Sequence, residues 1–128
     1  MATLARRDTA PELALRSVLH RRGLRYRVQL HVPGNRRRRI DIAFTRVKVA
    51  VFVDGCFWHG CPEHGTRPVA NSEWWDWKMQ RNQNRDADTN RLLAEHGWVV
   101  VRVWEHEDPV EAAERVAEVV RSRRARFS

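Results

Sequence analysis

The chain has 128 residues, of which 24 are Lys or Arg and 16 are Asp or Glu, giving a formal net charge of +8. This length fits a single domain, residues 1–128, and argues against a second one. No apolar run approaches the roughly 20 residues that span a bilayer, and the N-terminus lacks an apolar signal core, so we expect a cytoplasmic protein with no membrane partner. An arginine-rich excess of positive charge favours nucleic acid as the partner, and the alternative is a solvated basic surface.

The first part of the chain predicts a helix followed by a strand. Thr9 and Glu12 fit a capping box with proline in the first turn, and apolar residues then keep helical spacing until Gly23. Period-two alternation over 24–31 predicts a strand with one solvated face. The turn-forming residues at 33–35 then reverse the chain.

Two more strands and a long loop are expected next. A short strand is predicted over 40–44, after a run of four arginines. The nearly continuous apolar run over 47–53 suits a central strand covered on both faces, and the two residues between these strands fit a hairpin. Residues 54–72 have the composition of a loop that binds a metal ion.

The last part of the chain predicts two helices separated by a core strand. A long helix is expected over 73–96, ending at Gly97, and an apolar strand over 98–104. A final helix is expected over 110–123, and residues 121–128 are expected to be a frayed basic tail. The pattern as a whole predicts an α/β domain in which helices flank a mixed sheet.

Metal-binding residues are concentrated in the predicted loop. Cys56, Cys61 and His64 have the spacing Cys-x4-Cys-x2-His, and His106 follows the last predicted strand. Because strand ends cluster in space, His106 is the candidate fourth ligand of a closed structural Zn²⁺ site, and the alternative is that it is an ordinary surface histidine. The only two cysteines lie in one loop, so a metal site explains them better than a disulfide scaffold does.

Asp41 is the acid best placed for chemistry. It lies in a predicted strand between Ile40 and Ile42, where alternation puts it on the face opposite both isoleucines. It also adjoins the end of the strand that carries Asp54, so a hairpin would present two carboxylates suited to Mg²⁺. The alternative is a solvent-facing aspartate paired with the neighbouring arginines.

The predicted long helix has polar residues on its buried face. Trp75, Asn82, Asp86 and Leu93 fall on one narrow stripe at about 100° per residue. Asn82 and Asp86 could bond to the metal loop and orient His59, or they could satisfy buried backbone groups instead.

Two further features have a structural and a functional interpretation. Glu12 is assigned a structural role by its place in the capping box. Phe57, Trp58, Trp74 and Trp75 flank the metal loop on a basic surface, where aromatic rings can wedge between bases or stack on them. The alternative is that these rings pack around the zinc loop.

Motifs along nearly the whole chain occur in a highly specific order and spacing. They are Arg7 to Glu12, Gly23 to Arg27, Pro33-Gly34 followed by Asp41, Val51 to His59, Trp75, Asn82, Arg85-Asp86, Gly97-Trp98 and Val103 to His106. In these motifs the chain resembles the very short patch repair (Vsr) DNA mismatch endonucleases, a branch of the PD-(D/E)xK restriction-endonuclease-like superfamily. The resemblance implies a three-layer α/β fold and a Mg²⁺-dependent nick in one strand of double-stranded DNA beside a T·G mismatch, leaving a 3′-hydroxyl and a 5′-phosphate.

The resemblance also implies roles for individual residues. Asp41 corresponds to the principal Mg²⁺ ligand, together with the backbone carbonyl of Val53. His59 corresponds to the histidine that activates the attacking water, Asp86 to the acid that orients it, and Glu12 to an acid in the metal shell. Phe57, Trp58 and Trp75 correspond to an aromatic wedge, and Cys56 and His106 to zinc-ligand positions, while Cys61 and His64 fit a loop whose ligands vary in the family. We also expect Arg36, Arg37, Arg38 and Asn82 to contact DNA.

The sequence departs from the family pattern in three places. Asp54 replaces a histidine and is therefore a candidate additional metal ligand. Residues 35–39 replace a tighter turn with an arginine run, and the chain begins close to the first motif, so we expect it to lack the N-terminal arm that helps relatives grip mismatched DNA. Cleavage chemistry is therefore better supported than mismatch specificity.

Two other functions compete with mismatch repair. One is a DNA endonuclease without mismatch preference, acting in restriction or phage defence, and the other is a catalytically silent zinc-stapled DNA-binding module. The presence of Asp41, His59 and Asp86 together argues against the silent module. We expect a monomer, with mismatch-repair proteins as further partners.

Overall fold

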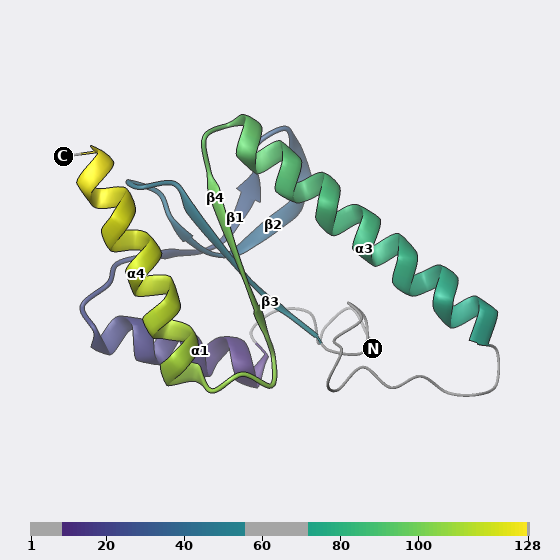
Figure 1. Cartoon of the computed structure of the whole chain (residues 1–128), viewed down its shortest axis with the longest axis horizontal. Coiled ribbons are helices and arrows are strands. Elements are labelled where there is room, and N and C mark those ends of the chain that lie inside the picture. Colours follow the sequence, from purple (N-terminus) through teal and green to yellow (C-terminus); the bar gives the residue numbers. More distant parts are fainter. Residues whose placement is uncertain (1–8, 56–71, 128) are drawn as a thin grey trace.

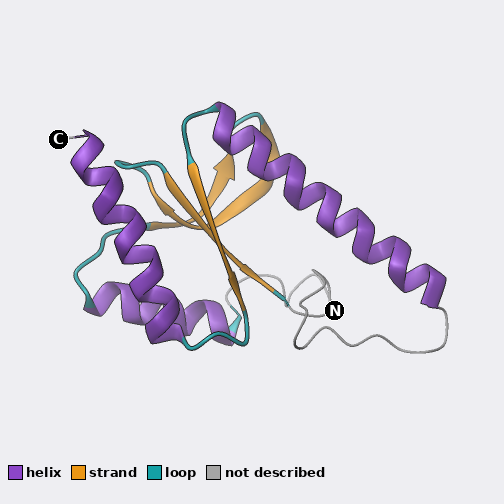
Figure 2. Cartoon of the chain, in the orientation of Figure 1, coloured by secondary structure: helices purple, strands orange, loops and turns teal. Residues whose placement is uncertain are grey.

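The computed structural model describes residues 9–55 and 72–127, which form a three-layer α/β arrangement (Figures 1 and 2). Helices α1 and α4 cover one face of a central sheet, and α3 covers the other. The predicted α/β class is therefore confirmed. None of the helices in this part of the chain is long and apolar enough to cross a membrane. The elements in order are α1 (Ala10–Arg21), β1 (Arg27–Val32), β2 (Asn35–Phe44), β3 (Val49–Asp54), α3 (Ser72–Glu95), β4 (Val99–Trp104) and α4 (Pro109–Phe127).

The four strands form one mixed sheet in the order β1-β2-β3-β4. β1, β2 and β3 pair antiparallel, whereas β3 and β4 pair parallel from Val49–Val99 to Asp54–Trp104. Gly34 supplies the positive φ of +88° at the β1–β2 turn, and α3 lies in the connection from β3 to β4. Parallel pairing brings the C-terminal ends of β3 and β4 to the same edge of the sheet.

A separate apolar cluster fills the space on each face of the sheet. Burying these aliphatic side chains is the main force that holds the three layers together. The cluster under α1 and α4 includes Leu15, Leu19, Ile42, Val49, Val51, Val116 and Val120. The cluster under α3 comprises Val32, Ile40, Ala43, Ala50, Phe52 and Leu93.

The N-terminus of α1 differs from the predicted capping box. Thr9 is the N-cap residue with an extended backbone, but its side chain makes no capping hydrogen bond. The carboxylate of Glu12 is instead engaged by Arg16 and by the amide of Gln29. The capping-box prediction was wrong, because the strand that follows the helix offers Glu12 buried partners away from the helix terminus.

The arginine run belongs to a strand, although the sequence pattern started this strand only at residue 40. β2 begins at Asn35, and His31 of β1 lies opposite Arg39. Backbone pairing with β1 supports these residues, so the strand forms without apolar alternation. β1 itself begins at Arg27, later than the predicted start at residue 24.

The C-terminal residues predicted as a frayed tail are helical up to Phe127. The guanidinium of Arg123 donates hydrogen bonds to the carbonyl oxygens of Val47 at 3.0 Å and Gly97 at 2.6 Å. These contacts tie the end of α4 to the turns that precede β3 and β4. A basic composition therefore did not indicate fraying here.

Candidate active site

Asp41 replaces a backbone group in the pairing of β2 with β3. The antiparallel register runs from Phe44–Val49 to Ile42–Val51. Just beyond it, the Asp41 carboxylate accepts a hydrogen bond from the backbone N–H of Val53 at 2.9 Å. The carboxylate is thus held beside Val53, which the sequence resemblance pairs with Asp41 in metal binding.

The strand is irregular at Asp41. Ile42 packs in the cluster under α1 and α4, whereas Ile40 packs in the cluster under α3. The prediction that Asp41 faces away from both isoleucines was therefore wrong, because regular alternation breaks at this point. On β1, Gln29 falls opposite Asp41 in the register and has a left-handed φ of +54°. A non-glycine residue in this region costs about 1–2 kcal/mol, so the surrounding contacts must hold it.

Glu12 forms a second buried acid beside Asp41. Its side chain is only 1% exposed, is paired with Arg16, and accepts a hydrogen bond from Gln29 Nε2 at 3.3 Å. Helix α1 supplies Glu12 and strand β1 supplies Gln29, so two elements converge on the irregular part of β2. The residue pattern assigned Glu12 a structural role and the family resemblance implied a place in the metal shell, and burial beside Asp41 is compatible with both.

Burial raises the pKa of Asp41 to about 7, and the nearby negative charges of Glu12 and Asp54 add to this effect. The hydrogen bond from Val53 and the positive charge of Arg102 act in the opposite direction. A carboxyl group in such surroundings gains most from a bound cation, which stabilises its ionised form. A divalent cation therefore fits the chemistry of this site, although residues 9–55 and 72–127 contain no group of three His, Cys, Asp or Glu side chains arranged to hold a metal ion.

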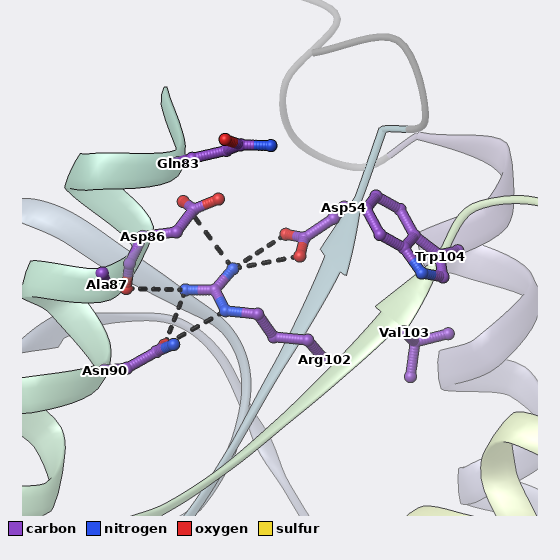
Figure 3. A pocket seen from close by; sticks show the side chains of 8 residues that line it. All are labelled: Asp54, Gln83, Asp86, Ala87, Asn90, Arg102, Val103 and Trp104. Carbon is purple, nitrogen blue, oxygen red and sulfur yellow. Dashed lines mark hydrogen bonds and ion pairs between the residues drawn. The ribbon is translucent and has the colours of Figure 1, made fainter. Parts of the chain in front are cut away.

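A second set of charged groups lies on the other side of β3, around the guanidinium of Arg102 (Figure 3). Arg102 donates to both carboxylate oxygens of Asp54, at 2.9 and 3.1 Å, and lies 3.7 Å from the Asp86 carboxylate. It also donates to Asn90 Oδ1 from two nitrogens, at 3.1 and 2.9 Å. These residues line a cavity of about 270 Å³ between α3 and the ends of β3 and β4.

The structure places the described DNA-contact candidates on two elements. Trp75 lies near the start of α3 with its ring edge-on to Trp74, and Asn82 is buried and accepts from Arg85 at 3.3 Å. Arg36 and Arg37 on β2 are exposed. Arg38 instead reaches α3, where it donates to Asp88 at 2.7 Å and to Thr89 at 3.0 Å. Arg38 therefore links β2 to α3, which the sequence did not predict.

Several predicted site residues fall outside the part of the chain that the structure describes. They are Cys56, Phe57, Trp58, His59, Cys61 and His64. Their proposed fourth zinc-binding partner, His106, is exposed in the turn after β4. β3 ends at Asp54, and this segment follows it in the sequence.

Two residues of the site were missed by sequence reasoning. Arg102 carried a signal, because it is the one charged residue in the apolar run Val-Val-Val-Arg-Val-Trp of β4. A buried charge requires a counter-charge, so this run could have predicted an acidic partner on a neighbouring strand. Gln29 carried no such signal, since its left-handed backbone is not marked by glycine.

Comparisons with known proteins find similarity to DNA nicking enzymes and to mismatch endonucleases. A family model described as DNA mismatch endonuclease Vsr matches residues 1–64. The chain is 46% identical over 117 residues to Type II nicking enzyme V.NaeI from Lentzea aerocolonigenes, covering 90% of this chain and 70% of that protein. It is 38% identical over 112 residues to Type II nicking enzyme V.XorIIP from Xanthomonas oryzae, covering 84% and 77%. It is 37% identical over 107 residues to DNA mismatch endonuclease Vsr from Escherichia coli, covering 82% and 66%.

Proposed function

The chain belongs to the Vsr family of DNA endonucleases, and from this premise we propose that it nicks one strand of duplex DNA beside a T·G mismatch in a Mg²⁺-dependent reaction. Membership makes the protein a DNA strand-nicking endonuclease. The observation that carries the proposal is the buried carboxylate of Asp41 beside Val53, where β2 runs alongside the C-terminal end of β3. We also propose that the three layers are those of the restriction-endonuclease-like fold.

Asp41 is the proposed principal ligand of Mg²⁺, with the backbone carbonyl of Val53 as its neighbour and Glu12 as an acid of the outer shell. Mg²⁺ accepts a few oxygen ligands and keeps several waters, which suits one buried carboxylate and one carbonyl. When bound, the ion withdraws negative charge from the scissile phosphate and the leaving oxygen. Asp54 is a further acid at this edge, and its role is developed in the next subsection.

Proton transfer is assigned to His59, with Asp86 as the residue that orients its ring. An imidazole can take a proton from the attacking water near neutral pH, and a carboxylate bonded to its other nitrogen fixes the tautomer. Asp86 projects from α3 into the cavity at the ends of β3 and β4, which supports this role (Figure 3).

Recognition of DNA is divided between charge and aromatic rings. The exposed Arg36 and Arg37 are suited to phosphate contacts, which position the duplex without reading its sequence. Phe57, Trp58 and Trp75 are proposed to wedge into the duplex, and Asn82 supports the helix that carries Trp75. A T·G mismatch lowers the energy of opening the duplex by a few kcal/mol, so a wedge favours cleavage there.

The proposed zinc site stabilises the loop that carries the wedge. Cys56, Cys61, His64 and His106 make a complete tetrahedral donor set, which leaves no open position for catalysis. We expect about one zinc ion per chain by metal analysis. Cys61→Ala should lower the melting temperature, and a well-folded protein without zinc contradicts this part of the proposal.

The experiment that tests the function measures nicking of matched and T·G-mismatched duplexes of the same sequence in Mg²⁺. We expect preferential cutting of one strand of the mismatched duplex, with 3′-hydroxyl and 5′-phosphate ends, and no cutting by Asp41→Ala. Trp58→Ala should slow nicking of the mismatched duplex on the order of 10-fold while leaving binding to matched DNA nearly unchanged.

A second candidate function is nicking without mismatch preference, as part of a restriction system. The observation that favours it is the 46% identity to a Type II nicking enzyme, against 37% to the mismatch endonuclease from Escherichia coli. Equal cutting of matched and mismatched duplexes selects this candidate. Absence of cutting in both would overturn the endonuclease proposal itself.

A further inference from the structure

We propose that Arg102 is a positioning residue of the nicking reaction, which fixes Asp54 and Asp86 relative to each other by bridging β3, β4 and α3. The inference rests on the proposed function and deepens it. It also assigns Asp54 a role as the anchor of this bridge, in place of a direct metal ligand.

Arg102 is held on all sides by groups from three elements (Figure 3). It lies opposite Phe52 in the parallel register, with its guanidinium 4.3 Å from the centre of that ring. Its side chain is 22% exposed, so these contacts are shielded from water. Fixing a long side chain costs rotamer entropy, and several charge-assisted hydrogen bonds are needed to offset it.

Both carboxylate oxygens of Asp54 take part in this bridge. One Arg102 nitrogen donates to both of them, and the Asp54 side chain is only 10% exposed. Asp54 lies two residues after Phe52 on β3, which puts its side chain on the same face of the sheet as Arg102. A metal ion at Asp54 would have to compete with this pair, whereas Asp41 has no ion pair in the described part of the chain.

The same guanidinium restrains the helix that carries Asp86. It donates to the backbone carbonyl of Asp86 at 3.5 Å and to Asn90 one turn later. The end of β3 and one turn of α3 are thereby held at a defined separation. Asp86 is the acid proposed to orient His59, so the bridge fixes the position of the acid in that proposed pair.

The charge of Arg102 gives the bridge a second effect. Without it, the buried carboxylate of Asp54 and the half-buried carboxylate of Asp86 would lose the cation that both of them contact, and Asp54 also acts on Asp41 as a nearby negative charge. Removing one partner of a buried ion pair is costly because the remaining charge is left uncompensated. Arg102 therefore balances the negative charge of Asp54 and Asp86. Asp41 is left as the acid available to a metal ion.

The test compares full-length Arg102→Met, Arg102→Lys, Asp54→Asn, Asp41→Asn and the double variant Asp54→Asn/Arg102→Met with the parent. Nicking kinetics are measured across Mg²⁺ and DNA concentrations, and folding is checked by thermal melting. Arg123→Ala is the matched control, since it removes an arginine that also bridges three elements, at the opposite end of β3 and β4.

We expect Arg102→Met to lower kcat about 10- to 100-fold with little change in KM for DNA, as loss of an orienting partner does. Arg102→Lys should recover part of kcat, because it keeps the charge but not the fork of donors. The double variant should be no slower than the slower single variant, since both substitutions break one bridge. Arg123→Ala should melt at a lower temperature with kcat near that of the parent.

Parental kcat in a folded Arg102→Met overturns the inference. A rise in the Mg²⁺ requirement of Asp54→Asn comparable to that of Asp41→Asn also overturns it, because Asp54 would then be a ligand. If Arg102→Met fails to fold, the kcat values of Arg102→Lys and Asp54→Asn decide. A parent that nicks no duplex overturns the proposed function and the positioning role together, which separates that failure from one in Arg102 alone.

Discussion

Asp41, on the β2 side of β3, and Asp54, bonded to the β4 side, differ in the groups that compensate their charge. On the β2 side, Asp41 is buried with a backbone N–H as its hydrogen-bond donor, and its pKa is raised to about 7. On the β4 side, Asp54 is buried with both oxygens bound by Arg102. Both carboxylates are buried near the C-terminal end of β3. The difference in their hydrogen-bond partners therefore comes from the strand that each one faces, and not from how deeply each is buried.

This difference separates an acid that is available to a cation from one whose charge is already balanced. Burial is the main cause of the raised pKa of Asp41, and the positive charge of Arg102 and the Val53 hydrogen bond compensate its ionised form only in part. Arg102 supplies that charge to Asp54 from within the chain. The antiparallel side therefore fits the proposed metal-binding half of the site, and the parallel side fits the proposed scaffold that orients other groups.

The largest expected effect is on catalysis, and it comes from removing each aspartate in turn. Asp41→Ala should slow nicking at least about 1,000-fold, or about 4 kcal/mol, because the principal metal ligand is lost. Asp54→Asn should slow it only on the order of 10-fold, because it disturbs orientation. Single-turnover nicking at saturating Mg²⁺ measures both. A larger loss for Asp54→Asn than for Asp41→Ala would reverse the assignment of the two sides.

The next effect is on stability and follows from the direction of the Asp41 pKa. The pKa is about 7 in the folded protein against a usual value of 3.8, so the folded state holds this proton more tightly than the unfolded state does. Its contribution to stability is complete below about pH 4 and is lost as the pH rises through about 7. The loss amounts to at most about 4 kcal/mol, and water that reaches the group reduces it.

Urea unfolding of the parent and of Asp41→Asn in Mg²⁺-free buffer between pH 4 and 8 measures this contribution. The parent should lose stability relative to Asp41→Asn as the pH rises, and added Mg²⁺ at pH 8 should restore stability to the parent alone. Parallel curves for the two proteins would show that Asp41 carries no unbalanced charge, and the comparison between the two sides of β3 would fail.

The smallest effect concerns the left-handed residue beside Asp41. Gln29→Gly should change the free energy of unfolding by less than about 1 kcal/mol, because relief of the positive φ offsets the lost side-chain contacts. Nicking should nevertheless fall roughly 5-fold, since Glu12 loses a partner that positions it. Lys48→Gly is the control, because Lys48 has a similar φ of +57° at the other end of β3. Equal nicking by both variants would remove Gln29 from the site.

Much of the fold could be predicted from local patterns. The central strands and the long helix were predicted within a few residues, because continuous apolar runs and glycine stops report burial and helix ends directly. The start of β2 was missed, since Arg36 to Arg39 form a strand through pairing with β1 and not through alternation. The last turns of α4 were missed because Arg123 finds its acceptors on distant turns.

The residues of the candidate site likewise fall into those that local sequence patterns indicate and those that depend on contacts between distant segments. Asp41 could be identified from sequence, because an acid inside a predicted strand next to a strand end is unusual on local grounds. The Asp54–Arg102 pair was not predicted: Arg102 stands out as a charge in an apolar run, but which acid it meets depends on the parallel register that sets Phe52 opposite Arg102. A parallel register is determined by packing of the crossover helix, which no short-range pattern reports.

The order of the strands also sets the order in which the site can be assembled during synthesis. β1, β2 and β3 are neighbours in both sequence and sheet, so they can pair as soon as they leave the ribosome. β4 must wait for the whole crossover segment, because parallel pairing closes a long loop. Asp41 is therefore in place early, but Asp86 and Arg102 join it only after α3 and β4 have been made. We expect a nascent chain of this nuclease to remain unable to cut DNA until its final strand has docked.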